Sequence, residues 1–284
     1  MSLSRNIIAN KASWAIGRTR ARVISFVAQG EVVMLAWPIA SAMLGETIMG
    51  LVDTKLVGNL GAAALGGVGV AGSLLHLSYV TVLGLMRGVK VCTAYAVGRG
   101  QPYHGIRYAQ MGMVLGIGCG ALCAVGFQYA APALKAVQIG PDLIAPAIDF
   151  LKARSWGLPA TFGLIALIEH RQGVGDVRTP MLVGLVGNVI NAFLAYGLIY
   201  GHFGLPALGV KGAGYGTSIV EFLQLSALGV LLWRSSRQQK KAPAAMPELH
   251  WRLALRELLM VGMPTALHFG FETTAFVAFT AILG

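Results

Sequence analysis

Charged residues are scarce in this 284-residue sequence, where Asp, Glu, Lys and Arg together make up only 12%. A soluble globular domain carries roughly a quarter of its residues as charges, so the composition excludes that class. Apolar residues make up 56% of the chain, and the mean hydropathy is +0.68. They gather in stretches of about 20 residues, which suit membrane-spanning helices rather than shorter barrel strands. The sequence therefore predicts an all-α integral membrane protein, a polytopic helical bundle.

Cysteine and catalytic motifs are also scarce. The chain has three cysteines, and Cys119 and Cys123 share one face of an apolar helix, where they serve as small packing residues. Neither a disulfide framework nor a zinc site is predicted. The sequence has no P-loop, nucleophile elbow, zinc motif or dinucleotide fingerprint. We therefore expect neither an enzyme nor a resident cofactor, and no ATP-driven pump within this chain.

Acidic residues number only 11 against 22 Lys and Arg, which gives a net charge of +11. The basic residues lie between the apolar stretches, as the positive-inside rule expects, and no nucleic-acid-binding module is visible. If the N-terminus lies in the cytoplasm, 17 of the 22 Lys and Arg residues fall in cytoplasmic regions. The outer regions hold the other five, Arg154 among them. This asymmetry predicts a cytoplasmic N-terminus, membrane lipid as a partner and no nucleic acid.

Seven apolar segments organise the chain, and glycines spaced four apart inside them predict close helix packing. The second segment is followed by a basic stretch into which its helix can continue. Thr179 is expected to cap the fifth segment at Pro180. The expected segments are at about 32–56, 62–85, 106–130, 142–171, 180–200, 208–233 and 255–282.

Four domains follow from these segments. Residues 1–30 form a basic, acid-free arm, interpreted as a cytoplasmic amphipathic arm in preference to an organelle transit peptide. Residues 31–234 form a six-helix lobe, and 235–252 form a polar linker that contains proline. Residues 253–284 add one further helix.

Three carboxylates lie inside stretches apolar enough to span a bilayer: Glu46, Asp53 and Glu272. An ionised carboxylate is costly at that depth, which makes each of them a candidate functional group. Two helical turns separate Glu46 from Asp53, so both lie on one helix face, about 10 Å apart. The alternatives are a structural acid paired with a neighbouring helix and a protonated, hydrogen-bonded acid. Acids at separated points in a membrane chain favour a cation or proton site.

Two asparagines and a histidine are further candidates for the cation or proton site. Asn188 and Asn191 share a helix face, where amides either bridge helices or bind a cation through their carbonyls. His268 stands four residues before Glu272, so this pair can share a proton.

Other polar residues are assigned to a cavity wall or to the membrane surface. His76 and Tyr79 are candidate cavity-lining residues, although aromatic packing explains them equally well. Glu169, Arg171, Asp176 and Arg178 are expected at the cytoplasmic surface, as solvated or loop-fixing charges.

The order of four motifs resembles the multidrug and toxic compound extrusion family. LAWPIASAMLGETIMGLVDTKLVGNLGAAALGGVGVA, at 35–71, is similar to that family's first helix and its turn into the second. RQGVGDVRTPM, at 171–181, resembles the signature between helices four and five. NAFLAYGLIYGHFGLPALGVKGAGYGT, at 191–217, and GMPTALHFGFE, at 262–272, resemble helix five through the start of six and the opening of helix seven.

The resemblance implies twelve helices in two six-helix lobes, with a cavity that opens to either side of the membrane in turn. It matches Asp53 to the first-helix acid where protons or sodium act, and Asn191 to a helix-five asparagine near that acid. It matches Glu272 to the seventh-helix glutamate of a subgroup with a cation site in the second lobe. Two positions depart from the family: Ala195 replaces an aspartate of one subgroup, and Glu46 replaces a neutral polar residue.

The function implied by the resemblance is a cation-coupled antiporter that exports organic cations or amphiphilic drugs. The coupling ion is Na⁺ or H⁺, with Na⁺ at Asp53 or Glu272, and the expected location is a bacterial inner membrane. The chain is expected to hold the first lobe and one helix of the second, so it is truncated or a second chain supplies the rest. A lipid or polysaccharide-precursor flippase and a non-transporting fragment are the alternatives.

Overall fold

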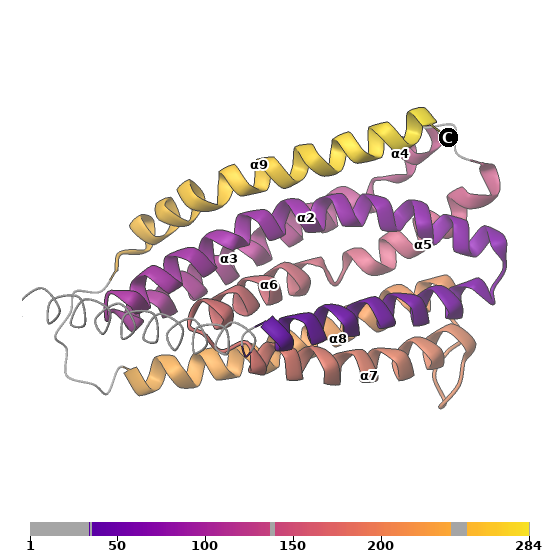
Figure 1. Ribbon diagram of the computed structural model, residues 1–284. Helices are drawn as coiled ribbons and strands as arrows, with labels where there is room; N and C mark the ends of the chain where they lie inside the picture. Colours follow the sequence, from indigo (N-terminus) through magenta and orange to yellow (C-terminus); the bar gives the residue numbers. More distant parts are fainter. Residues whose placement is uncertain (1–33, 35, 137–139, 240–248, 284) are drawn as a thin grey trace, which may run out of the picture.

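The computed structural model describes residues 34, 36–136, 140–239 and 249–283. All regular secondary structure in this part of the chain is helical. The long helices lie side by side with similar directions, in one bundle (Figure 1). A helix satisfies its backbone hydrogen bonds internally, which is the requirement that lipid imposes on a spanning segment. The predicted fold class, an all-α membrane bundle, is confirmed.

The observed helices follow the predicted segments and mostly exceed them in length. The first helix spans residues 36–58 without a break. The remaining helices are α2 (Ala62–Gly98), α3 (Pro102–Gln128), α4 (Ala131–Ala136), α5 (Pro141–Ser155), α6 (Leu158–Gly173), α7 (Arg178–Tyr200), α8 (Val210–Gln239) and α9 (Trp251–Leu283).

Four of the described helices, α2, α3, α7 and α8, are long and apolar enough to cross a membrane. The longest of these, α2, has 37 residues, so it continues from its apolar segment into the basic stretch beyond it. At 1.5 Å per residue its length is about 55 Å, well above the roughly 30 Å of a hydrocarbon core. The extension carries Arg87 and Lys90 on a helix of the bundle rather than on a loop.

The apolar segment predicted over 142–171 forms two helices, α5 and α6, rather than one. Pro159 stands in the first turn of α6, where its missing N–H needs no partner. Inside one continuous helix, the same residue would interrupt the hydrogen-bond ladder. The break brings Arg154, near the end of α5, within 3.3 Å of the Thr161 hydroxyl in α6.

The start of α7 is capped by a different residue from the one expected. The carboxylate of Asp176, one residue before the N-cap Val177, accepts a hydrogen bond from the Thr179 backbone N–H at 3.0 Å, so Asp176 and not Thr179 supplies the capping side chain. Arg171 forms an ion pair with the same carboxylate at 2.9 Å. Partial burial favours a higher pKa, but the Thr179 hydrogen bonds and the Arg171 charge together hold the pKa of Asp176 below its ordinary value. The predicted loop-fixing role of Arg171 and Asp176 is confirmed.

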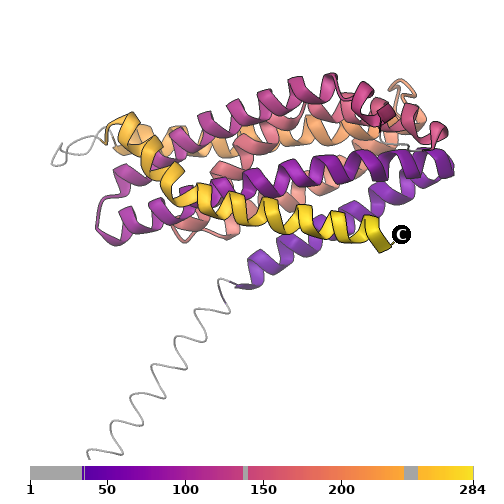
Figure 2. The same cartoon turned by 90° about the horizontal axis from the view of Figure 1, so that it is seen from above.

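Glycines allow the closest helix contacts, as the sequence predicts. A view from above shows α9 running beside α2 (Figure 2), and a Cβ on Gly84, Gly88 or Gly262 would overlap the backbone of the facing helix. Gly116 of α3 lies against the Phe162 carbonyl of α6 in the same way. Small residues let backbones touch in lipid, where burial of apolar surface contributes little to helix association.

Two buried clusters hold the helices that surround the site. The larger lies where α2, α3, α6 and α9 meet, and Met86, Phe162 and Leu258 are among its fully buried members. The second joins the first helix to α7 and α8 through Val57 and other small or branched residues. The Tyr200 hydroxyl also donates to the Leu56 carbonyl at 2.7 Å. These contacts fix the first helix against α7.

The division into four domains stays a prediction. The basic arm over 1–30 lies outside the described residues, as do residues 240–248 of the linker. The further helix is observed as α9, which packs along α2 of the predicted first lobe.

Candidate functional site

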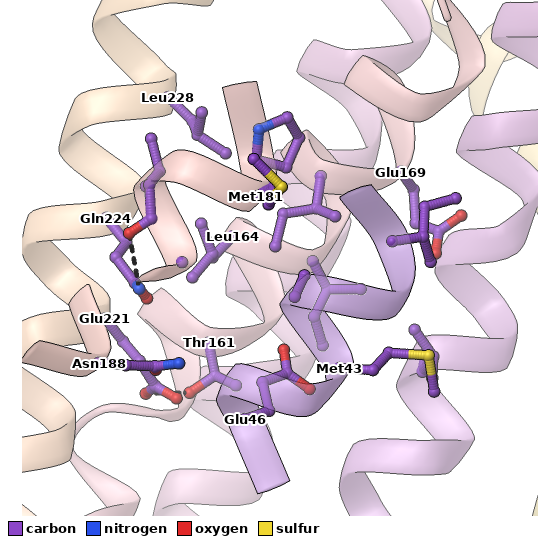
Figure 3. A pocket seen from close by; sticks show the side chains of 18 of the residues that line it. Met43, Glu46, Thr161, Leu164, Glu169, Met181, Asn188, Glu221, Gln224 and Leu228 are labelled. Carbon is purple, nitrogen blue, oxygen red and sulfur yellow. Dashed lines mark hydrogen bonds between the residues drawn. The ribbon is translucent and has the colours of Figure 1, made fainter. Parts of the chain in front are cut away.

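A cavity of about 650 Å³ opens between the first helix, α2, α6, α7 and α8. Between its ends the lining is mainly apolar, with Leu164, Met181 and Leu228 among the side chains, and Gln224 lies beside them (Figure 3). Polar residues lie toward both ends. On α6, for example, Thr161 and Glu169 both line the cavity, and eight residues of helix separate them by about 12 Å.

One polar contact joins the first helix to α7. The amide Nδ2 of Asn191 donates to Oδ2 of Asp53 at 3.4 Å, and Asn191 is only 3% exposed. The other oxygens of the pair, Oδ1 of Asp53 and Oδ1 of Asn191, are buried and have no hydrogen-bond partner among the described residues. A carboxylate and an amide oxygen with free lone pairs can accept a proton or ligate a small cation.

Three further candidates line the same cavity: Glu46, Tyr79 and Asn188. Glu46 is exposed, and Figure 3 shows it on the same side of the cavity as Asn188 and Thr161. Since Glu46 and Asp53 both line the cavity, the shared helix face that their spacing predicts is confirmed.

The remaining three candidates, His76, His268 and Glu272, are not among the residues that line this cavity. His76 is exposed on α2. The side chains of His268 and Glu272 are 73% and 69% exposed, and Nε2 lies 3.9 Å from Oε2. That distance is beyond hydrogen-bond reach, so the pair shares no proton in this arrangement. The functional roles of all eight candidates stay predictions.

A buried ion pair at one end of the cavity is not expected from the sequence. Arg154 Nη2 lies 2.6 Å from one oxygen of Glu221, and the Thr161 hydroxyl donates to the other oxygen at 2.5 Å. The charge distribution places Arg154 in an outer region and gives it no partner, whereas in the structure its side chain is paired and only 13% exposed. The break between α5 and α6 explains the difference, because it places Arg154 opposite α8. Pro159 is the one signal for this break in the sequence.

The prediction that Glu169 is a solvated surface charge is wrong. Its side chain is 4% exposed rather than solvated, and Oε1 lies 3.4 Å from Arg87 Nη1. Lys90 Nζ donates to Gln172 Oε1 at 2.8 Å, and all four residues line the cavity. The extension of α2 beside α6 explains this arrangement. The signal available in the sequence is the spacing of Arg87 and Lys90, three residues apart on a helix that continues.

The site lies within a region that is similar to known proteins. The MatE family model matches residues 38–197, more than half of this chain. The multidrug resistance protein PmpM of Pseudomonas aeruginosa is 30% identical over 258 residues, which are 89% of this chain and 54% of that protein. The probable multidrug resistance protein NorM of Xanthomonas campestris pv. campestris is 29% identical over 252 residues, which are 88% of this chain and 55% of that protein.

A solved structure supports the same fold. The crystal structure of the eukaryotic MATE transporter AtDTX14 matches with a TM-score of 0.76 at 18% identity, over 88% of this chain and 55% of that one. This chain thus spans about half the length of the curated relatives that it matches.

Proposed function

This chain belongs to the MatE family of multidrug and toxic compound extrusion transporters, and we propose from that premise that it forms one lobe of a cation-coupled antiporter. The cargo is an organic cation or amphiphilic drug that leaves the cell, and the coupling ion is Na⁺ or H⁺ that enters it. The names of PmpM and NorM, both multidrug resistance proteins, support export as the function and a transporter rather than an enzyme.

The observation that carries the proposal is the pair of unpartnered oxygens on Asp53 and Asn191, buried at the wall of a cavity. A carboxylate in such a place favours a bound cation or a bound proton over the bare charge. The Asn191 amide holds one carboxylate oxygen and leaves the other for the ligand. One acid can then bind cationic cargo and the coupling ion in turn, because each ligand displaces the other.

The neighbouring residues have supporting roles in this mechanism. Glu46 adds a second negative charge on the same wall and attracts the cationic group of the cargo. Glu221 already has Arg154 and Thr161 as partners, so it contributes no free charge. The mainly apolar stretch of the cavity, which includes Leu164, contacts the apolar body of the cargo.

We place the lobe in a bacterial inner membrane with its N-terminus in the cytoplasm. Four described helices of spanning length and two bacterial relatives support a bacterial membrane, and the distribution of Lys and Arg supports the orientation. Asp53 then lies toward the outer face, where the coupling ion enters. A second lobe, on the same or another chain, would complete the transport path.

The experiment is Asp53→Asn in a full transporter that contains this lobe, because this change removes the charge and retains the shape. Resistance of cells to cationic drugs should be lost, while the amount of protein in the membrane stays the same. Asp149→Asn is the matched control, since Asp149 is 47% exposed and pairs with Lys211 away from the cavity. Full resistance of the Asp53→Asn strain would overturn the assignment. Flux into proteoliposomes under separate Na⁺ and pH gradients identifies the ion.

A lipid or polysaccharide-precursor flippase is the second candidate, and one observation favours it. Arg87 and Lys90 line the cavity, and basic side chains bind phosphate groups. The cavity also holds Glu46 and Asp53, which repel phosphate, so cationic cargo is preferred. A binding comparison between fluorescent cations and anionic lipid-linked precursors separates the two functions.

A further inference from the structure

Two basic side chains of α2 stand at one end of the cavity. Arg87 and Lys90 are one helical turn apart and line the same wall. Arg87 lies 3.4 Å from Glu169, and Lys90 donates to the neutral amide of Gln172. This end therefore holds two cations and one carboxylate, which leaves one positive charge without a counter-ion among the lining residues.

The charges at the other end have the opposite sign. Glu46 and Asp53 carry two carboxylates there, and the charge of Glu221 is balanced by Arg154 at 2.6 Å. On α6, eight residues separate Thr161, which donates to Glu221, from Glu169, which contacts Arg87, a rise of about 12 Å. The cavity is thus polarised, with a mainly apolar stretch between a negative end and a positive end.

We propose that Arg87 and Lys90 form an anion subsite, so that the preferred cargo is amphoteric, with a cationic group and a carboxylate, sulfonate or phosphate. This inference rests on the proposed function, because it refines the cargo class of the same cavity. The cationic group lies against Glu46 and Asp53, and the anionic group lies against Arg87 and Lys90.

The subsite has the free donors that an anion needs. Arg87 has five N–H donors, and its contact with Glu169 is a single one at 3.4 Å, so most donors remain available. Lys90 has three donors and uses one for Gln172. Glu169, whose side chain is 4% exposed, anchors the guanidinium at the wall. A planar guanidinium beside an ammonium suits a carboxylate or phosphate in geometry and charge.

The test compares two dyes that differ in one charge, rhodamine B, which has a free carboxylate, and its methyl ester, which is a cation only. Fluorescence anisotropy measures their binding to the 284-residue chain in phosphatidylcholine nanodiscs. We expect rhodamine B to bind about tenfold more tightly than the ester. Lys90→Gln should remove most of this difference by weakening binding of rhodamine B, and it leaves no charge unpaired, because Gln172, the partner of Lys90, is neutral.

A second variant tests the subsite without leaving a buried charge unpaired, so that it is expected to fold. Arg87→Gln alone leaves the buried Glu169 carboxylate unpaired, so it is combined with Glu169→Gln, which keeps the local charge and removes the guanidinium. This double variant should also weaken binding of rhodamine B selectively. Arg99→Gln is the matched control, since Arg99 is exposed at the end of α2 and does not line the cavity.

Failure of the subsite and failure of the proposed function give different results. Equal binding of both dyes, unchanged by Lys90→Gln, overturns the anion subsite and leaves the acidic end intact. If Asp53→Asn weakens binding of neither dye, or if neither dye binds, the proposed cation site fails as well. Nanodiscs with phosphatidylglycerol test a lipid source of the anion. Loss of the rhodamine B preference in those discs assigns the subsite to a lipid headgroup and overturns the amphoteric cargo.

Discussion

The side-chain amide of Asn191 on α7 donates to the Asp53 carboxylate of the first helix at 3.4 Å, across 138 positions of sequence. Each residue keeps one buried oxygen without a partner in the described structure. An ion or proton that binds Asp53 therefore also meets Asn191, and movement of the first helix relative to α7 changes both at once.

Asn191→Leu should weaken binding of the coupling ion, because it removes the hydrogen bond that orients the Asp53 carboxylate. We expect a loss of about 1 kcal/mol, roughly a fivefold change in affinity. The measurement is the Na⁺ concentration, or the pH, at which a bound fluorescent cation is half displaced. Asn188→Leu is the matched control, since Asn188 lines the cavity without being the donor to Asp53. Equal midpoints for both variants would contradict the assignment.

Arg154→Met should destabilise the chain by about 3–5 kcal/mol, because it leaves the Glu221 carboxylate buried without its cation. The double variant Arg154→Met/Glu221→Leu should recover much of this loss. Denaturant unfolding in detergent measures both. Lys211→Met, which breaks an exposed pair with Asp149, should cost less than about 1 kcal/mol. If the single Arg154 variant is as stable as the wild type, the Arg154–Glu221 ion pair does not contribute to the free energy of unfolding.

Gly116→Ala should lower the free energy of unfolding by about 1–3 kcal/mol, because the new methyl group overlaps the Phe162 carbonyl of α6. Gly118 is two residues away on the same helix, and a methyl group there meets nothing within 4 Å. Gly118→Ala should therefore be neutral or slightly stabilising. Thermal unfolding of the two variants side by side checks the contact between α3 and α6, and equal melting temperatures would count against it.

Asp176→Asn should cost about 1 kcal/mol at neutral pH, because it removes the charge that pairs with Arg171 and retains the cap oxygen. The pKa of Asp176 lies below its ordinary value of 3.8, so its stabilisation is complete above that value. It is lost as the pH falls through the lowered pKa. Unfolding measured at neutral pH and at pH about 2 should show a difference from wild type that vanishes in acid. A difference that persists in acid would exclude the charge as its cause.

The helices could be predicted from the sequence because an apolar run long enough to span a membrane must form a helix, whichever segments lie beside it. Where a prediction fails, a single residue explains it: Pro159 divides the fourth segment, and Asp176 replaces Thr179 as the cap. The candidate acids could also be found from the sequence. The free-energy cost of an ionised carboxylate depends on the apolar residues that flank it along the chain. The seven-residue spacing places Glu46 and Asp53 on one face without any knowledge of other helices.

The partners of these acids could not be found in that way. The Thr161 hydroxyl meets Glu221 across 60 positions, and Arg87 meets Glu169 only because α2 continues beside α6. Helix spacing places residues on a face, but it does not say which helix that face meets.

The sequence by itself determined that this protein is a membrane bundle with carboxylates at bilayer depth, because hydropathy and helical periodicity are properties of the local chain. Only the tertiary structure decided which of those charges are free. Packing of α5 against α8 neutralises Glu221 with Arg154, whereas Asp53 keeps an unpartnered oxygen beside Asn191. Packing of α2 beside α6 adds Arg87 and Lys90 to the cavity, because long-range contacts, and not the order of residues, set its electrostatics.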